Sequence, residues 1–263
     1  MIKTAAQAIP VYAMSIFNIH MGIYDDIQRI IANFWWGSRN DKKAIHWSRW
    51  NKLSQATCKG GMGFRDFSSF NQALVAKQGW RILQFPDSLV AKILQARYFQ
   101  HKDFMNARLG SNPSFIWRSI LWGRQVISKG SRWRIGNGQS IMLHKENWLP
   151  RPLTFKPISK PSLPADALVA ELINEEHTWN EGLIHRHFAK IDAEAIVRIL
   201  LPRRPMKDEV IWHYDRKGQY SVKSGYQIAL NLKFPARPTS SVLSVRKCIF
   251  IKEKTVILHF KSY

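Results

Sequence analysis

The stretch Gly60–Arg81, GGMGFRDFSSFNQALVAKQGWR, places three glycines within four residues directly before a run with helical periodicity. A glycine-rich turn that opens a helix can bind a phosphate through backbone N–H groups. The spacing, however, matches neither GxxxxGK[ST] nor GxGxxG, and no β-branched strand precedes it. We therefore interpret the glycines as a tight turn that allows close helix approach. The helix that follows is expected to be capped by Asp66 or Ser68 and to continue to about Gln84.

Charge is the dominant feature of the composition. The 263 residues include 40 Lys and Arg against 18 Asp and Glu, which gives a net charge of +22. Such a chain repels itself unless a polyanion neutralises it, and the phosphates of nucleic acid reward scattered cations through counterion release. Nucleic acid is the leading partner, and the alternative is a basic surface with no partner. The eleven tryptophans are interpreted as core residues more often than as base-stacking groups.

Other compositional signals exclude several classes of protein. The two cysteines, Cys58 and Cys248, match no CxxC pattern, so we expect neither a disulfide framework nor a zinc site. This usage fits a reducing, intracellular compartment. No run of eighteen apolar residues is present, so the sequence predicts no membrane span. We expect no cofactor, no metal and no small-molecule substrate.

Hydrophobic periodicity and turn residues predict a chain made mainly of helices. Around Asn137-Gly138 the pattern alternates, and this dipeptide strongly indicates a β-hairpin with a type I′ turn. A second strand–turn–strand is expected around Lys217-Gly218. The expected helices cover residues 3–17, 23–36, 66–84, 87–98, 113–128, 166–174, 181–188 and 193–201.

The fold class that follows is mainly α with small β-hairpins, in two loosely joined parts. Five prolines between residues 149 and 164 predict a linker at that point. We expect a helical region over 1–148 that ends in a hairpin, the linker 149–164, a small α+β segment over 165–233, and a divergent, poorly ordered tail over 234–263.

No residue pattern indicates catalysis. Tyr24-Asp25-Asp26 is similar to the aspartate motif of polymerases, but its spacing is short and its context helical, so helix capping explains these acids better. His185 and His187 are one residue apart without further ligands, which favours a helix surface over a metal site. No GxSxG sequence is present. On its residues alone, the chain is not expected to be an enzyme.

Several motifs together carry a resemblance to a known family. They are, in order, IKTAAQAIPVYAMSIFNI, DDIQRIIANFWWGS, KAIHWSRWNKLS, GGMGFRDFSSFNQALVAKQGWRIL, SRWRIGNGQSIMLHKENWLP and GQYSVKSGY. They resemble the region downstream of the polymerase palm in plant non-LTR, LINE-type retrotransposon reverse transcriptases. The resemblance covers roughly residues 2–232.

The resemblance implies a helical thumb and a connecting region that leads to a reverse-transcriptase zinc-binding domain, often followed by ribonuclease H. It implies that a complete palm, with its metal-binding aspartates, is absent. From about Phe234 the sequence departs from the family pattern, and it does not supply the zinc ligands. No known catalytic residue of the family maps onto this chain, so the resemblance implies a truncated fragment.

Three hypotheses about function remain. The first is a non-catalytic module that binds template–primer or element RNA, as RNA or an RNA/DNA duplex, through phosphate contacts. The second is a decayed retroelement product with no activity, and the third is an active polymerase or nuclease. Because positive charges cluster there, we expect the following residues to contact nucleic acid: Arg39, Lys42, Lys43, Arg49, Lys52, Lys59, Arg132 and Arg134.

Overall fold

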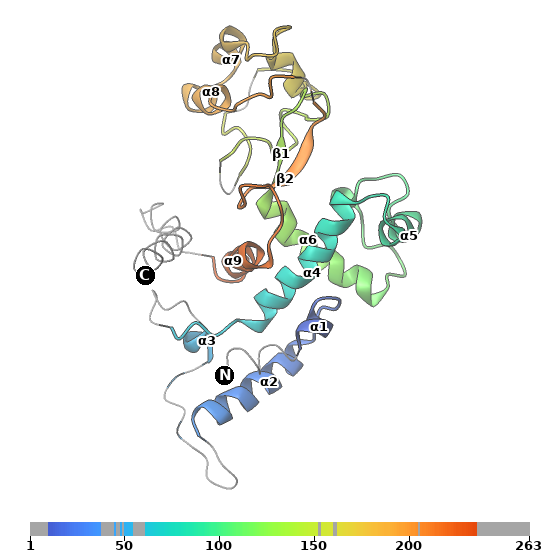
Figure 1. Cartoon of the computed structure of the whole chain (residues 1–263), viewed down its shortest axis with the longest axis vertical. Helices are drawn as coiled ribbons and strands as arrows, with labels where there is room; N and C mark the ends of the chain where they lie inside the picture. Colours follow the sequence, from blue (N-terminus) through green and yellow to red (C-terminus); the bar gives the residue numbers. More distant parts are fainter. Residues whose placement is uncertain are drawn as a thin grey trace, which may run out of the picture. The chain divides into compact units, whose positions relative to one another are not determined.

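The structure is a computed structural model that describes residues 10–37, 45, 48, 50–54, 61–151, 154–159, 162–204 and 206–235. Within these residues the chain is largely helical, with one two-stranded antiparallel sheet (Figure 1). The expected class, mainly α with small β elements, is confirmed. None of the described helices is long and apolar enough to cross a membrane.

The elements of Figure 1 follow one another along the chain. The short 3₁₀ turns are η2 (Phe104–Asn106) and η3 (Val169–Leu172), and the strands are β1 (Ser131–Arg134) and β2 (Glu209–Trp212). The helices are α1 (Val11–Met14), α2 (Met21–Trp35), α3 (Trp50–Leu53), α4 (Phe67–Gln84), α5 (Leu89–Tyr98), α6 (Phe115–Gly130), α7 (Glu181–His187), α8 (Lys190–Val197) and α9 (Val222–Lys233).

The described residues fall into two compact units, and each is treated by itself. The first unit takes its residues from 1–12, 19–70 and 229–263, and the second from 13–18 and 71–228. The division therefore falls inside α1, α4 and α9. The domain boundaries expected from the sequence were different, and their assignment stays a prediction.

The start of α2 in the first unit differs from the expectation. The ring of His20 accepts a hydrogen bond from the Gly22 N–H at 3.2 Å and caps the helix. The first turn contains no acidic residue, so the interpretation of Asp25 and Asp26 as acids that cap this helix in its first turn is wrong. Asp26 instead pairs with Arg29 one turn later, at 2.6 Å. Both side chains of that pair are largely exposed, so its contribution to stability is small.

The buried face of α2 also differs from the expected one. Tyr24 and Ile31 are buried, and the Tyr24 ring stacks on Phe67 with a centroid distance of 6.3 Å. Helical periodicity predicts an inward-facing stripe that contains Ile30, Ile31 and Phe34. Ile30 and Phe34 are instead 68% and 69% exposed. Residues seven apart lie on one helix face, and here Tyr24 and Ile31 define that face. Periodicity located the helix and the buried Ile31 correctly, but the buried face turns toward Tyr24 and away from Ile30 and Phe34.

The glycine-rich stretch forms the expected tight turn. Gly63 has φ of 69°, in the left-handed region where a glycine avoids the Cβ clash. The backbone N–H of Phe64 donates to the Leu53 carbonyl at 3.3 Å, which ties the turn to the end of α3. The Phe64 ring is buried edge-on against Trp35, with a centroid distance of 5.3 Å.

Asp66 caps α4 and joins two distant parts of the first unit. Its carboxylate accepts the Ser69 N–H at 2.8 Å, as an N-cap residue does. The second oxygen lies 2.8 Å from the Lys233 ammonium at the end of α9. The sequence offered Asp66 and Ser68 as alternative caps of α4, and Asp66 is therefore the cap.

In the second unit, buried amides on α4 bind backbone carbonyls of other segments. Asn71, which is fully buried, donates to the carbonyls of Met14 and Phe17 at 2.5 and 2.7 Å. Gln72 donates to the Trp122 carbonyl at 3.1 Å. A buried amide without partners would cost stability, so these bonds specify which segments pack on α4.

Two glycines allow α4 and α6 to approach each other closely. A Cβ on Gly123 would lie 2.6 Å from the Ala76 backbone nitrogen, and one on Gly79 would lie 2.9 Å from Ile127 Cδ1. Real Cβ atoms do not approach backbone this closely, so position 123 requires glycine. Large aromatic side chains fill the surrounding core, and the expectation that tryptophans lie in the core is confirmed for Trp80, Trp117, Trp148 and Trp212.

The strand pairing corrects the expected hairpin around Asn137-Gly138. β1 pairs with β2 in antiparallel register, from Ser131 opposite Trp212 to Arg134 opposite Glu209. The reason lies in the loop after β1 and in the residue before β2. The Asp208 carboxylate accepts the backbone N–H groups that follow β1, and this draws β2 to the first strand.

Three backbone bonds form this loop contact. The N–H groups of Gly136, Gly138 and Ser140 donate to Asp208 at 2.7, 2.9 and 2.8 Å. Gly138 has φ of 73°, so the positive φ that Asn-Gly predicts is present, although the turn serves a long-range contact. The turn at Lys217-Gly218 is also formed, with the Trp212 N–H donating to the Gly218 carbonyl at 2.8 Å. The strand expected after this turn is wrong, because residues 219–221 form no strand and α9 begins at Val222.

The proline-rich segment 149–164 lies between residues that share one hydrophobic core. The core joins residues before the segment to residues of η3, α7 and α8 after it. Its buried members are Ile135, Ile141, Leu143, Trp148, Leu149, Ala167, Val169, Leu172, Ile184, Phe188, Ala193 and Ile196.

The contact between α4 and α6 generates a stability prediction. Gly123→Ala is expected to lower the free energy of unfolding by about 2–4 kcal/mol, because the added methyl group forces two helix backbones apart. Gly182→Ala on α7 is the matched control, since its Cβ would meet nothing closer than 3.7 Å. The control should leave stability unchanged or raise it by up to about 1 kcal/mol through helix propensity. Urea unfolding followed by far-UV circular dichroism measures both; equal effects would contradict the close approach.

Candidate nucleic-acid interface

Of the residues nominated from the sequence, three lie in the described part of the chain. Lys52 is exposed on α3 of the first unit, and Arg132 and Arg134 lie on β1 of the second unit. The contacts of these two arginines are therefore the part of the candidate site that the structure describes. The nominated residues outside the described residues are Arg39, Lys42, Lys43, Arg49 and Lys59.

The two arginines share one face of the sheet. Alternate residues of a strand point to the same face, and directly opposed residues of an antiparallel pair do so as well. Arg132 and Arg134 therefore lie on one face with Ile211 and Glu209, their partners on β2. Arg134 and Glu209 form an ion pair at 3.4 Å, in which both side chains are about half exposed. This pair is weak and easily exchanged for another anion.

Arg132 is the more unusual of the two because its charge is partly buried. Its Nε donates to Nδ1 of His213 at 3.2 Å, and one terminal nitrogen donates to the Trp133 carbonyl at 3.1 Å. Among the described residues, no carboxylate pairs with it. Burial, and then the charge of Arg134, lower the pKa of the Arg132 guanidinium, but an arginine stays protonated in a protein. The sheet face therefore holds a cation whose hydrogen-bond acceptors are both neutral.

Burial and a neighbouring cation keep the His213 ring neutral at neutral pH. Burial, and then the nearby charge of Arg132, lower the pKa of this histidine from 6.5 to about 4. At neutral pH its Nδ1 accepts the hydrogen bond from Arg132 and adds no second charge. Its ring packs edge-on against Phe155, with a centroid distance of 4.9 Å, and against Tyr214, with a centroid distance of 5.0 Å.

Phe155 is held in a strained conformation by the proline-rich segment. It has φ of 52°, a region that costs a residue with a side chain roughly 1–2 kcal/mol. Its carbonyl accepts the N–H groups of Trp148 and Leu149, each at 2.9 Å, and its own N–H donates to the Arg151 carbonyl at 3.0 Å. The surrounding backbone thus determines this conformation and places the ring against His213.

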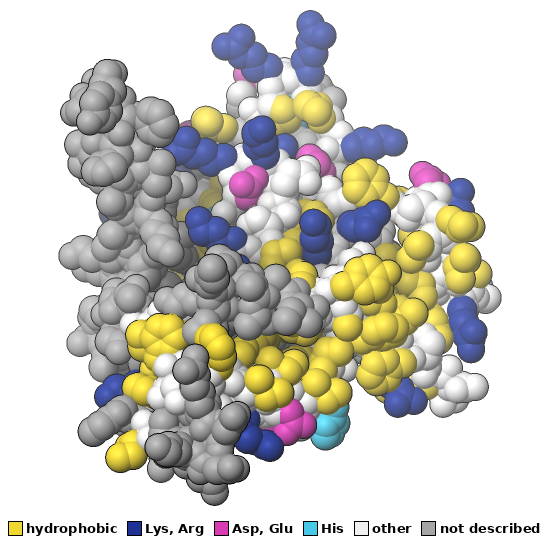
Figure 2. Space-filling view, turned by 60° about the horizontal axis from the view of Figure 1, so that its bottom comes forward, with side chains coloured by type: hydrophobic (Ala, Val, Ile, Leu, Met, Phe, Trp, Pro, Cys, Tyr) yellow, Lys and Arg dark blue, Asp and Glu magenta, His cyan; other side chains and the backbone are white. Residues whose placement is uncertain are grey.

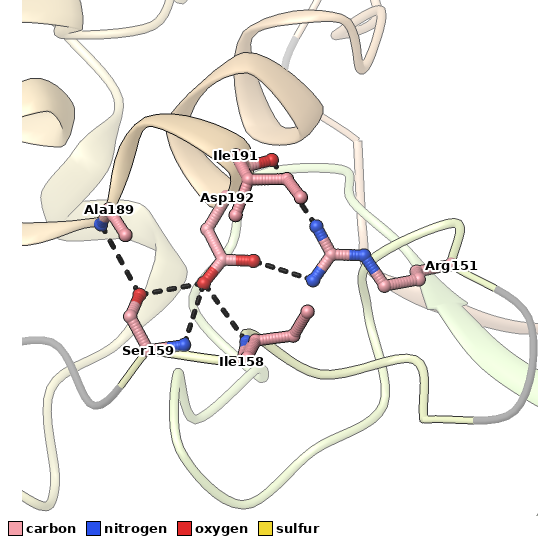
Figure 3. Close-up of polar contacts among 6 residues, drawn as sticks. All are labelled: Arg151, Ile158, Ser159, Ala189, Ile191 and Asp192. Atoms are coloured by element: carbon pink, nitrogen blue, oxygen red, sulfur yellow. Dashed lines mark hydrogen bonds and ion pairs between the residues drawn. The ribbon is translucent and has the colours of Figure 1, made fainter.

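A buried ion pair anchors the same segment on α8 (Figure 3). The fully buried Asp192 carboxylate accepts from Arg151 at 2.6 Å, from the Ile158 and Ser159 backbone N–H groups at 2.9 and 2.8 Å, and from the Ser159 hydroxyl at 2.6 Å. Burial alone would raise the pKa of the Asp192 carboxyl, but the bonds from Ser159 and Arg151 outweigh burial and lower it. The ionised carboxylate therefore fixes both sides of Phe155.

The turn after β2 brings further cations to the sheet. The Asp215 carboxylate accepts the backbone N–H groups of Lys217 and Gln219 at 2.9 and 3.2 Å and so shapes this turn. A Cβ on Gly218 would lie 3.2 Å from a terminal nitrogen of Arg134, so the arginine reaches across β2 to the turn. The exposed side chains of Arg216 and Lys217 lie on the same turn. The sequence indicated the turn, but no local signal placed it beside Arg134.

The arrangement suits anion binding. Arg132, Arg134, Arg216 and Lys217 offer charged N–H donors beside a neutral histidine, which is the chemistry that binds phosphate oxygens. On the face drawn in Figure 2, Lys and Arg side chains lie scattered among hydrophobic patches rather than in one continuous stripe. Within the described ranges, no group of three His, Cys, Asp or Glu side chains is placed to hold a metal ion.

The two histidines weighed as metal ligands lie on α7. His185 is exposed, and Nδ1 of His187 lies 2.7 Å from the Ser162 hydroxyl. The expected position of both on a helix is confirmed.

Comparison with known proteins identifies two relatives in Arabidopsis thaliana. The chain is 41% identical over 145 residues to "Uncharacterized mitochondrial protein AtMg00310", an alignment that covers 55% of this chain and 92% of the relative. It is 30% identical over 261 residues to "Putative ribonuclease H protein At1g65750", which covers 94% of this chain and 40% of the relative. The chain thus spans less than half the length of the second relative.

These names are typical of retrotransposon-derived reading frames in plants. No family model matches the chain. No solved structure matches it either.

The buried pair of Figure 3 generates a stability prediction. Asp192→Asn is expected to lower the free energy of unfolding by about 3 kcal/mol or more, because it leaves the Arg151 guanidinium without a counter-charge. Glu194→Gln on the same helix is the control, since its pair with Arg198 is exposed and 4.0 Å long; it should cost no more than about 0.5 kcal/mol. Chemical unfolding at neutral pH compares them, and similar small losses in both would show that Asp192 does not anchor the segment.

The lowered pKa of His213 predicts a pH dependence of stability. The unfolded chain takes up a proton near pH 6.5, and the folded chain does so only near pH 4. Stability is therefore fully present above pH 6.5 and falls as the pH drops toward 4. The expected loss from this histidine is about 2 kcal/mol between pH 7.5 and pH 5.

The test compares urea unfolding of the wild type and His213→Gln at both pH values. The difference between the two proteins isolates this histidine from the others. Between pH 7.5 and pH 5, the free energy of unfolding of the variant should fall by about 2 kcal/mol less than that of the wild type. An identical loss in both proteins would mean that His213 is already protonated or solvated when folded.

Proposed function

This chain belongs to the family that includes the uncharacterized mitochondrial protein AtMg00310 of Arabidopsis thaliana, and from this premise we propose that it is a non-catalytic, retroelement-derived module that binds nucleic-acid backbones. The observation that carries the proposal is the sheet face on which Arg132 and Arg134 meet. There a partly buried guanidinium has a neutral partner and, within the described residues, no paired carboxylate.

The charge of the whole chain supports the same partner class. A net charge of +22 favours association with a polyanion and makes the affinity depend strongly on salt. Phosphate contacts position a nucleic acid without reading its sequence. RNA or an RNA/DNA duplex is the proposed partner, in keeping with the retroelement-like names of the relatives.

The finer assignment rests on the motifs described above. We assign the chain to the thumb and post-palm region of a LINE-type reverse transcriptase, on the approach to its zinc-binding domain. The 30% identity that extends over 94% of the chain supports a common origin with the second relative. The ribonuclease H named for that relative would be an activity of the longer protein, of which the chain spans 40%.

Two other functions make different predictions. A decayed retroelement product with no activity would bind nucleic acid weakly and without dependence on particular arginines. An active polymerase or nuclease would extend a primer or cut the RNA strand of a hybrid with purified protein and Mg²⁺ or Mn²⁺. We expect neither extension nor cleavage, and reproducible turnover that is lost on mutation of the chain's own acids would overturn the non-catalytic proposal.

The sheet face generates a binding prediction. Arg132→Gln with Arg134→Gln should weaken binding to a fluorescein-labelled RNA/DNA hybrid about tenfold or more at low salt, because two charge-assisted contacts are lost. The slope of log affinity against log salt should fall by about 1.4–1.8. Fluorescence anisotropy over a potassium chloride series measures both quantities.

A charge-matched control separates local contacts from net charge. Arg118→Gln with Arg186→Gln removes two exposed arginines on α6 and α7, and neither forms an ion pair with another described residue. This control should retain most of the affinity and slope. Equal losses of affinity in both double variants would show that binding depends on net charge and not on the arginines of the sheet face. No binding by the wild type at low salt would refute the proposal.

A further inference from the structure

The corner between α4 and α5 exposes more apolar surface than its sequence pattern predicts. Helical periodicity over 87–98 predicts that Leu89, Ile93 and Leu94 face inward. Leu89 and Ile93 are instead 74% and 56% exposed, and of the three only Leu94 is buried. Phe85, the first residue after α4, is 64% exposed. An exposed phenylalanine in a fixed position offers a flat aromatic face to a partner.

A side-chain contact places this corner beside β2. Nε2 of Gln84, adjacent to Phe85, donates to the Val210 carbonyl at 3.0 Å. Two residues further along β2, the Trp212 N–H donates to the Gly218 carbonyl at 2.8 Å. Backbone groups two residues apart in a strand point to the same edge. The edge of β2 opposite β1 therefore holds both the end of α4 and the basic turn.

The corner is rigid because its backbone is bonded on both sides. The Phe85 N–H donates to the Arg81 carbonyl at 2.9 Å and so continues the α4 hydrogen-bond pattern. The Phe85 carbonyl accepts from the Ser88 hydroxyl at 2.8 Å and from the Ser88 N–H at 3.1 Å. Ser88 in turn caps α5 by accepting the Ala91 N–H. A partner would thus meet a ring whose backbone position is already set, which lowers the entropy cost of binding.

We propose that Phe85 is a base-stacking platform and that the surface between it and the basic turn takes a single strand of nucleic acid. In this arrangement Arg134, Arg216 and Lys217 hold the sugar–phosphate backbone while a base stacks on the ring. This inference rests on the proposed function and sharpens it. The face of a base is accessible in a single strand but covered by its neighbours in a duplex, so the site should prefer single strands.

The charge around the corner favours nucleic acid over a protein partner. Besides the turn, Lys92 on α5 and Arg81 on α4 are exposed. The acidic groups around this surface are engaged within the chain: Asp87, two residues after Phe85, pairs with Lys92 at 3.7 Å. Glu209 pairs with Arg134, and the Asp215 carboxylate accepts backbone N–H groups of its own turn. Aromatic rings interleaved with cations are typical of surfaces that bind single strands without sequence preference.

The experiment measures anisotropy of labelled oligouridylate RNA, oligothymidylate DNA and a blunt RNA/DNA hybrid with the whole chain. Phe85→Ala and Phe85→Leu should each weaken binding of the single strands about five- to hundredfold, because leucine keeps an apolar group but not the aromatic face. Phe85→Trp should retain or increase affinity. Binding of the blunt hybrid should change less than twofold in all three variants.

Phe115→Ala provides the matched control, since Phe115 is 57% exposed at the start of α6 and its substitution should leave the affinity for single strands unchanged.

The proposed function and the stacking platform fail with different results. If the wild type binds none of the probes, the proposed function fails. If it binds the hybrid but Phe85→Ala and Phe85→Leu bind single strands like the wild type, the stacking platform is overturned while backbone binding stands. Loss in Phe85→Ala that Phe85→Leu restores would also overturn stacking, because it indicates an apolar contact such as a protein partner would use.

Discussion

The candidate interface depends on one carboxylate, that of Asp208. It accepts three backbone N–H groups from the loop after β1, the first of them from Gly136, 72 residues earlier in the chain. Those N–H groups have no strand partner, so without the carboxylate their desolvation would oppose formation of the loop. Because Asp208 directly precedes β2, the contact sets the register in which Arg134 faces Glu209. The arginines of β1 and the histidine that follows β2 then meet on one sheet face.

The electrostatic character of that face follows from what surrounds it. Arg132 keeps its charge while burial keeps His213 neutral, so the pair presents one cation rather than two that repel each other. The ring of Phe155 covers the histidine, and the Asp192 carboxylate anchors the segment on both sides of that ring. An ion pair with a fully buried carboxylate thereby supports the surface chemistry. In a retroelement-derived protein, such a face suits a partner recognised by its phosphates.

The secondary structure was largely readable from the sequence, and the orientation of several helices was not. The periodicity located α2, α4, α5 and α6, and the capping by Asp66 and the tight turn at Gly63 followed from residue type. The inward faces predicted for α2 and α5 were only partly correct: Ile31 and Leu94 are buried, but both helices carry apolar residues on more than one stripe, and several of these are exposed. Which stripe is buried depends on what packs there, and the aromatic partner of Tyr24 lies 43 positions away at Phe67. The exposure of Leu89 and Ile93 on α5 has the same cause, because the sequence does not show which apolar stripe of this helix packs against another element.

The sequence by itself determined the helical class, the strong positive charge, the two positive-φ glycine turns and the arginines on β1. It also carried the motifs shared with retroelement proteins. Only the tertiary structure decided that β1 pairs with β2, that Arg132 lies against a neutral histidine, and that the turn at Gly218 and the corner at Phe85 meet the same strand edge. The physical reason is range: caps, turns and periodicity act within a few residues, whereas the contacts of β1 with β2, of Arg132 with His213 and of Gln84 with Val210 join segments separated by 75 residues or more. Their energies depend on burial, which no local pattern encodes.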